Sequence, residues 1–136
     1  MKIDGQCHCG DICYEAELDP EKVGICHCTD CQALSATAFR TVAIVSADGF
    51  QITKGTPKEY VKVGDSGNPR IQAFCPNCGS ALYATDVGDN PAAYNLRAGT
   101  IRQRADLAPK FEYWRRSAMP WLPEITSTRK FDQSAS

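Results

Sequence analysis

Hydrophobic and polar residues alternate along much of the chain, and the pattern is clearest in residues 12–18, which read ICYEAEL. Apolar side chains occupy the even positions from Ile12 to Leu18, whereas Cys13 and two glutamates occupy the odd positions. A period of two is typical of a β-strand with one buried face. The pattern therefore predicts a strand that carries Cys13 on its polar face, and we expect Cys13 to bind no metal.

Six further segments have the composition of strands, because they are rich in β-branched or aromatic residues and are separated by turn residues. They are residues 39–45, 50–53, 59–63, 70–74, 81–85 and 94–98. Helical patterns are short: one or two turns after Cys31, and a short piece within residues 108–116. The sequence predicts a mainly β fold, a β-rich sandwich with little helix.

The chain has 136 residues, of which 43% are hydrophobic, and this size suits one compact domain. We place the domain at residues 1–125 and expect residues 126–136 to form a frayed C-terminal tail. Residues 120–124, which read PWLPE, are expected to cover the core rather than to form an exposed apolar edge.

Charge and hydropathy limit the classes of binding partner that the sequence favours. Fifteen basic and sixteen acidic side chains give a formal net charge of −1, so no overall field attracts nucleic acid or an anionic membrane. The N-terminal residues lack an apolar stretch of signal-peptide length, and no run approaches the ~20 apolar residues of a membrane span. We expect a cytoplasmic protein that binds neither nucleic acid nor a membrane.

The eight cysteines are the main chemical feature of the sequence, and seven of them lie in clusters. Because a reducing cytosol keeps ordinary cysteine pairs as thiols, metal binding explains the clusters better than disulfides do. Buried cysteines that act as small hydrophobic residues would have no reason to repeat at ligand spacings. The clustered residues are Cys7 and Cys9, then Cys26, Cys28 and Cys31, then Cys75 and Cys78.

Each spacing has a geometric interpretation. In an extended segment residues i and i+2 point to the same side, so a Cys-x-Cys pair can offer both sulfurs to one ion, while His8 and His27 point away. Cys-x2-Cys, as in Cys75 and Cys78, is a common tight-turn spacing of zinc sites, and Gly79 lets the backbone curl behind the metal.

Seven sulfurs suggest a closed site of four and a second site of three. Counting does not determine which pairs join. If residues 26–31 act as a unit, the closed site contains Cys7, Cys9, Cys75 and Cys78, and we expect it to be structural.

A metal with three protein ligands keeps a fourth position for water or substrate, which is typical of catalytic zinc. Three thiolates on a divalent ion leave a charge of about −1 and favour a sulfur ligand, so we expect a thiol as the guest. Arg40, Arg97 and Arg102 are candidates for the cation that would offset a bound thiolate. In the alternative interpretation, Cys13 or a histidine closes this site as a second structural one.

The order of motifs resembles one known family. CHCGDICYE, CHCTDCQALSATAF, FCPNCGSALY and the closing MPWL, across roughly residues 3–122, are similar to the glutathione-dependent formaldehyde-activating enzyme (GFA) family, which includes centromere protein V. The resemblance implies a zinc-stapled β-tent with a structural zinc on Cys7, Cys9, Cys75 and Cys78, and a catalytic zinc on Cys26, Cys28 and Cys31. Ala36 stands where family members usually have glycine, and the chain is shorter than those of the named enzymes. Both differences concern the identity of the substrate and not the zinc sites.

The resemblance also implies a function. We expect a carbon–sulfur lyase, similar to S-hydroxymethylglutathione synthase, that acts on glutathione or a related thiol and a small aldehyde such as formaldehyde. No catalytic side chain is assigned, since His8 and His27 are equally explained as polar residues on ligand loops. The alternatives are a non-catalytic zinc module that carries glutathione or binds a protein, and a redox or metal-handling protein.

Overall fold

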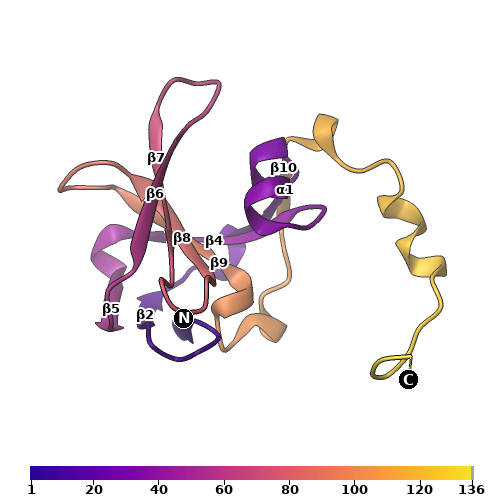
Figure 1. The fold of residues 1–136 in the computed structure, drawn as a ribbon, viewed down its shortest axis with the longest axis horizontal. Coiled ribbons are helices and arrows are strands. Elements are labelled where there is room, and N and C mark those ends of the chain that lie inside the picture. Colours follow the sequence, from indigo (N-terminus) through magenta and orange to yellow (C-terminus); the bar gives the residue numbers. More distant parts are fainter. Residues whose placement is uncertain (136) are drawn as a thin grey trace.

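The computed structural model describes residues 1–135, and within them ten strands form two sheets with little helix (Figure 1). The first sheet has the order β1-β2-β5, with β1 at Lys2–Gln6, β2 at Cys13–Glu17 and β5 at Phe50–Lys54. The second has the order β10-β3-β4-β9-β8-β7-β6. Its strands are β3 (Val23–Cys26), β4 (Arg40–Ser46), β6 (Lys58–Val63), β7 (Pro69–Phe74), β8 (Ala81–Asp86), β9 (Ala93–Arg97) and β10 (Phe111–Tyr113).

Helical structure is limited to one α-helix and several 3-10 turns in the described part of the chain. Helix α1, Thr29–Ser35, follows β3 and lies beside β10. The 3-10 turns are η1 (Pro20–Lys22), η2 (Ala47–Gly49), η3 (Ala98–Thr100), η4 (Arg104–Asp106), η5 (Arg115–Ser117) and η6 (Leu122–Ser127). No helix of the described residues is long and apolar enough to cross a membrane.

The two sheets share one hydrophobic core, which confirms the mainly β, single-domain fold. Tyr14 and Ala16 face the core from β2, and they meet Ala43 and Val45 of β4 and Leu96 of β9 there. The alternation in β2 is confirmed: its apolar residues are buried, its glutamates are exposed, and Cys13 is half-buried. Burial of side chains on one face of each sheet thus produces the period of two in the sequence.

All seven predicted strands are present, and no strand end is shifted by more than one residue. The predictions omitted β1, β3 and β10. β10 occupies Phe111–Tyr113, in the middle of the segment 108–116 in which a short helix was expected, and only the 3-10 turn η5 overlaps the end of that segment. β10 pairs with β3 in parallel, and all other pairings in the two sheets are antiparallel. Three residues carry too little periodicity to reveal a strand whose partner lies far away in the sequence.

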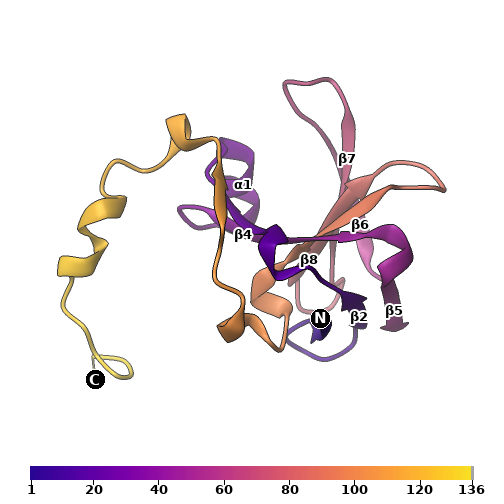
Figure 2. The same ribbon diagram turned by 180° about the vertical axis from the view of Figure 1, so that it is seen from behind.

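The C-terminal segment extends away from both sheets in the two opposite views (Figures 1 and 2). The expectation that PWLPE covers the core is wrong, because none of its five residues is buried and Trp121 is 50% exposed. Residues 126–135 are exposed throughout. The division at residue 125 stays a prediction, and η6 crosses it.

Candidate metal centre

The first cysteine group brings together residues that are far apart in the sequence. The sulfurs of Cys7, Cys9, Cys75 and Cys78 all lie within 4.8 Å of one another. The first two follow β1, and the other two lie in the turn between β7 and β8. Cys7 and Cys75 are buried in the common core. The group therefore connects the three-stranded sheet to the seven-stranded sheet.

Local backbone turns shape this group. Gly79 has a φ of 79° and its N–H donates to the carbonyl of Cys75 at 2.9 Å, which fits the expected curl of Cys-x2-Cys. The expectation that Cys7 and Cys9 converge through an extended segment is wrong. Residues 8 and 9 form a turn, closed by the Gly10 N–H donating to the Cys7 carbonyl at 3.1 Å.

Backbone amides and a hydroxyl surround the sulfurs of this group. The Ile12 N–H donates to Cys7 Sγ at 3.3 Å, and the Cys78 N–H lies 3.4 Å from Cys75 Sγ. The hydrogen bond with Ser80, 3.2 Å between Sγ and Oγ, lowers the pKa of Cys78 to about 5. Such donors stabilise thiolates, which are the form that binds metal.

The second cysteine group lies where β3 passes into α1. Cys26 ends the strand, Cys28 is the N-cap of the helix and Cys31 lies in its first turn, and their three sulfurs are within 4.8 Å of one another. The Cys31 N–H donates to Cys28 Sγ at 3.2 Å. Here Cys28 has the extended conformation expected of a Cys-x-Cys pair. The first turn of α1 then places Cys31, three residues after Cys28, so that it supplies the third sulfur.

Charge shows why this group suits a cation. Burial and the neighbouring sulfurs of Cys28 and Cys26 together raise the pKa of Cys31 to about 12. Three thiolates so close together therefore need a positive ion between them. Clustered soft sulfur ligands fit zinc, and both groups fit a metal by donor type and spacing.

Among the described residues, no fourth cysteine, histidine or carboxylate joins the three-cysteine group. Cys13 belongs to neither group, and its Sγ lies 3.7 Å from the Gly10 carbonyl. His27 points away from the sulfurs: its ring is fully buried and its Nε2 lies 2.7 Å from Glu112 Oε1. His8 is exposed. The structure therefore does not favour the alternative in which Cys13 or a histidine closes the site.

The contact between His27 and Glu112 holds residues 26–31, called the metal loop below, against β10. The sequence analysis did not predict this contact. The hydrogen bond from His27 lowers the pKa of Glu112, so the carboxylate accepts and Nε2 donates. The side-chain amide of Gln32 also donates to the His27 carbonyl at 2.8 Å and to the Ser117 carbonyl at 2.9 Å. The loop is thus held by residues about 85 positions later in the chain.

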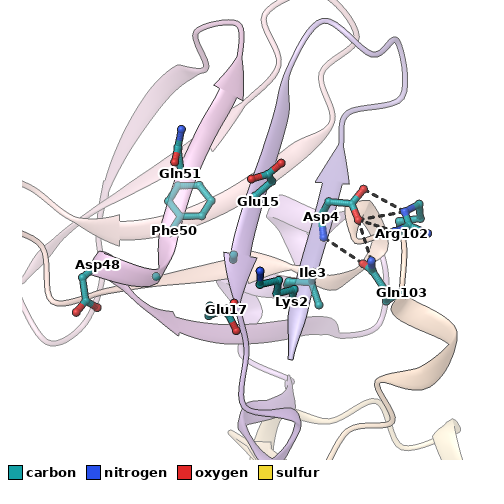
Figure 3. Close-up of a pocket in the computed structure, with 12 residues that line it drawn as sticks. Lys2, Ile3, Asp4, Glu15, Glu17, Asp48, Phe50, Gln51, Arg102 and Gln103 are labelled. Atoms are coloured by element: carbon teal, nitrogen blue, oxygen red, sulfur yellow. Dashed lines mark hydrogen bonds and ion pairs between the residues drawn. The ribbon is translucent and has the colours of Figure 1, made fainter.

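The three candidate arginines separate into two environments. Arg102 is 72% exposed and its guanidinium binds Asp4 at 2.8 Å, beside a polar hollow of about 620 Å³ over β1, β2 and β5 (Figure 3). No cysteine lines that hollow. Arg102 is thus paired with Asp4 and does not serve the three-cysteine group. Arg40 and Arg97 remain as candidates for the cation that would offset a bound thiolate.

Arg40 and Arg97 are buried and line a second pocket of about 330 Å³. Leu34 of α1 and Gly79 of the four-cysteine turn also line it, so elements that carry both cysteine groups border the pocket, although no cysteine lines it. Burial, with a smaller contribution from Arg40, lowers the pKa of Arg97 to about 9, and the sulfurs of Cys31 and Cys26 act in the opposite direction. Guanidinium groups stay charged at neutral pH. Two cations whose burial costs free energy therefore lie near the three sulfurs.

Comparison with known proteins identifies the family. The family model described as glutathione-dependent formaldehyde-activating enzyme matches residues 2–117, and the chain belongs to this family. A Schizosaccharomyces pombe protein named as an uncharacterized lyase is 28% identical over 97 residues, which cover 69% of this chain. The match spans 66% of that relative's own length, just under two thirds.

A solved structure has a similar fold. The crystal structure of a Rhodobacter sphaeroides protein superposes with a TM-score of 0.61 at 19% identity. The match covers 80% of this chain and 98% of the bacterial protein. At this level of identity the similarity concerns the fold alone.

Proposed function

We propose that this protein is a zinc-dependent carbon–sulfur lyase that acts on a thiol such as glutathione and a small aldehyde, as an S-hydroxymethylglutathione synthase does. One observation carries the proposal: Cys26, Cys28 and Cys31 gather without a fourth side-chain ligand among residues 1–135, close to two buried arginines. Membership of the GFA family and the lyase name of the yeast relative support it.

The two cysteine groups take different roles in this proposal. Cys7, Cys9, Cys75 and Cys78 would hold a structural zinc, because four sulfurs complete a tetrahedral site. The three sulfurs of the second group would hold a zinc with one position open to the thiol. When bound there, zinc would supply Lewis acidity that lets a thiol lose its proton near neutral pH.

The proposed reaction conserves atoms and electrons without any oxidant. The thiolate sulfur forms a bond to the aldehyde carbon, the π pair of the carbonyl moves to oxygen, and that oxygen takes up a proton. The reverse reaction breaks the same carbon–sulfur bond. His27 is poorly placed to move the proton, because its ring is fully buried and its Nε2 is bonded to Glu112.

The protein's own residues would position the reactants. The bonds from Glu112 and Gln32 hold the loop that carries Cys26 and Cys28. Arg40 and Arg97 offset the negative charge that accumulates when a thiolate joins three others. Such positioning can convert a slow encounter of thiol and aldehyde into a faster one, although thiols also add to formaldehyde unaided.

The test compares Cys28→Ala with Cys13→Ala, which removes a cysteine that belongs to neither group. We expect Cys28→Ala to retain about one zinc per chain instead of about two, and to lose the acceleration of S-hydroxymethylglutathione formation. Elemental analysis and exchange NMR with glutathione and formaldehyde measure the two effects. The Cys13 variant should match wild type in both.

The outcome separates the enzyme from the non-catalytic alternative. An unchanged rate in folded Cys28→Ala would contradict the lyase proposal. Wild type that binds glutathione without accelerating adduct formation would indicate a carrier. Two zincs that stay in place during dialysis against millimolar glutathione, with no thiol binding, would indicate a structural or interaction module.

A further inference from the structure

Arg40 and Arg97 have fewer partners than buried cations require. They are 4% and 9% exposed. Nε and Nη2 of Arg40 and Nε of Arg97 are buried and have no hydrogen-bond partner among the described residues. Arg97 Nη2 donates to Gln72 Oε1 at 2.6 Å, and neither arginine forms an ion pair with a carboxylate in residues 1–135. Three donors thus lack an acceptor, which proteins rarely tolerate.

The register of the sheet places these arginines next to the three-cysteine group. Arg40 lies opposite Cys26 in the pairing of β3 with β4, and paired residues project from the same face. Val42 lies two positions after Arg40 on that face and is opposite Arg97 of β9. Cys26, Arg40 and Arg97 therefore follow one another across a single face of the sheet.

Charge neutralisation by a thiolate does not supply the missing hydrogen-bond acceptors of this face. Three thiolates and one divalent ion carry about −1, and a bound substrate thiolate would bring this to about −2, which the +2 of the two guanidinium groups offsets. The substrate sulfur would complete the metal site, so the unpaired N–H donors of Arg40 and Arg97 would still need an acceptor from another group. A carboxylate fits the donors better than another sulfur does, because its two oxygens accept several hydrogen bonds and match the planar fork of a guanidinium.

The rest of the pocket is suited to the body of a small organic molecule. Besides the arginines and Gln72, its lining is apolar or aromatic and includes Leu34, Tyr60 and Phe74. A volume of about 330 Å³ lies within the range of small-ligand sites. Apolar walls around a few convergent charged donors are typical of specific ligand pockets.

We infer that Arg40 and Arg97 bind a carboxylate of the thiol substrate, so that the protein selects thiols that carry an acid a few bonds from the sulfur. Cys26 and Arg40 are cross-strand partners, and the Cβ atoms of such pairs lie about 5 Å apart, so one small molecule could contact both side chains. This inference rests on the proposed function, since it assumes that the sulfur of the same molecule reaches the three-cysteine group.

The experiment uses two thiols that differ in the acid alone, 3-mercaptopropionate and 3-mercaptopropanamide. Calorimetric titration of the zinc-loaded full chain measures the affinity for each, and propionate alone serves as a carboxylate probe without sulfur. We expect wild type to bind 3-mercaptopropionate at least about tenfold more tightly than the amide, as charge-assisted hydrogen bonds in a buried site imply. Equal affinities would overturn the inference, because the arginines would then only offset the charge of the thiolates.

Variants assign the preference to the pocket. Arg97→Gln should remove the difference between the two thiols, and Arg97→Lys should keep part of it, because lysine retains the charge but lacks the fork. Arg102→Gln is the matched control, since it removes a cation outside the pocket, and it should keep the full preference. A preference that persists unchanged in folded Arg97→Gln and Arg40→Gln would contradict the inference. If these variants fail to fold, the comparison of the two thiols on wild type decides alone.

The same titrations separate this inference from the proposed function. Tight binding of both thiols with equal affinity would leave the proposed function standing and reject the carboxylate site. Propionate binding that depends on Arg97, with no binding of either thiol to the three-cysteine group, would contradict the proposed function and support an acid-binding site.

Discussion

Ala36 occupies a backbone conformation that alanine disfavours. It has φ of 56° and ψ of 36°, in the left-handed region, and its N–H caps α1 by donating to the carbonyls of Ala33 and Gln32. Glycine is the usual residue at this position of a helix, because it lacks a Cβ. The departure from the family pattern at Ala36 thus concerns the end of the helix that carries Cys31. Ala36 is exposed and does not line the arginine pocket.

We therefore expect Ala36→Gly to stabilise the protein by about 0.5–1 kcal/mol, because relief of the left-handed strain outweighs the extra freedom of glycine when unfolded. Chemical denaturation of the zinc-loaded protein measures the change. Ala33→Gly, within the same helix, is the control and should destabilise by about 1 kcal/mol. A loss of stability in both variants would show that the cap is not strained.

At the scale of elements, β10 connects the C-terminal part of the domain to the metal loop. Its three residues pair with β3, the His27 N–H donates to the Tyr113 carbonyl at 3.0 Å, and Glu112 binds the His27 ring at 2.7 Å. The ring of Phe111 lies directly over Gly24, where a Cβ would clash with it. Close approach at Gly24 thus lets this short strand pack against β3.

Glu112→Ala should lower the melting temperature by about 5 °C, because it leaves the buried His27 ring without its partner. It should also speed the release of one zinc to a chelator, since the loop between Cys26 and Cys28 loses an anchor. Calorimetry and a colorimetric chelator assay measure these effects. Glu112→Gln keeps an acceptor and should change less, and Glu124→Ala, in the exposed η6, should change neither quantity. Equal zinc release in all three variants would exclude a role for this contact in the metal loop.

At the scale of the whole molecule, the four-cysteine group joins the two sheets. Cys9 and Cys75 are 66 positions apart, yet their sulfurs lie 3.7 Å from each other. A cross-link that closes a loop of this length removes much of the entropy of the unfolded chain, which amounts to about 4 kcal/mol, and metal coordination adds to it. Loss of the four-cysteine site should therefore destabilise the whole fold, whereas loss of the three-cysteine site should affect only the segment around residues 26–31.

Cys75→Ser should remove most of the stability of the fold, since domains of this size are stable by only about 5–15 kcal/mol. Circular dichroism and denaturant titration measure the loss. Cys13→Ser should stay within about 0.5 kcal/mol of wild type, and Cys28→Ala should remain folded. Comparable stability of the Cys75 and Cys13 variants would contradict a structural role for the four-cysteine group.

The sequence by itself determined the features that neighbouring residues encode. Alternation in residues 12–18 predicted β2 and the orientation of Cys13, because burial of one sheet face repeats every two residues. The spacing suggested a division of seven cysteines into four and three, and treating residues 26–31 as a unit, as the family resemblance also implied, gave the two sets of sulfurs that the structure gathers.

Only the tertiary structure decided the features that depend on distant pairing. Glu112 contacts His27 across 85 positions. Strand register places the buried Arg40 and Arg97 on one face of the sheet, whereas Arg102, outside the strands, is exposed. Trp121 belongs to a motif that predicted a core residue but lies outside the core. A local pattern records which face of an element is apolar, whereas the partner of that face is set by long-range packing, which no short stretch of sequence contains.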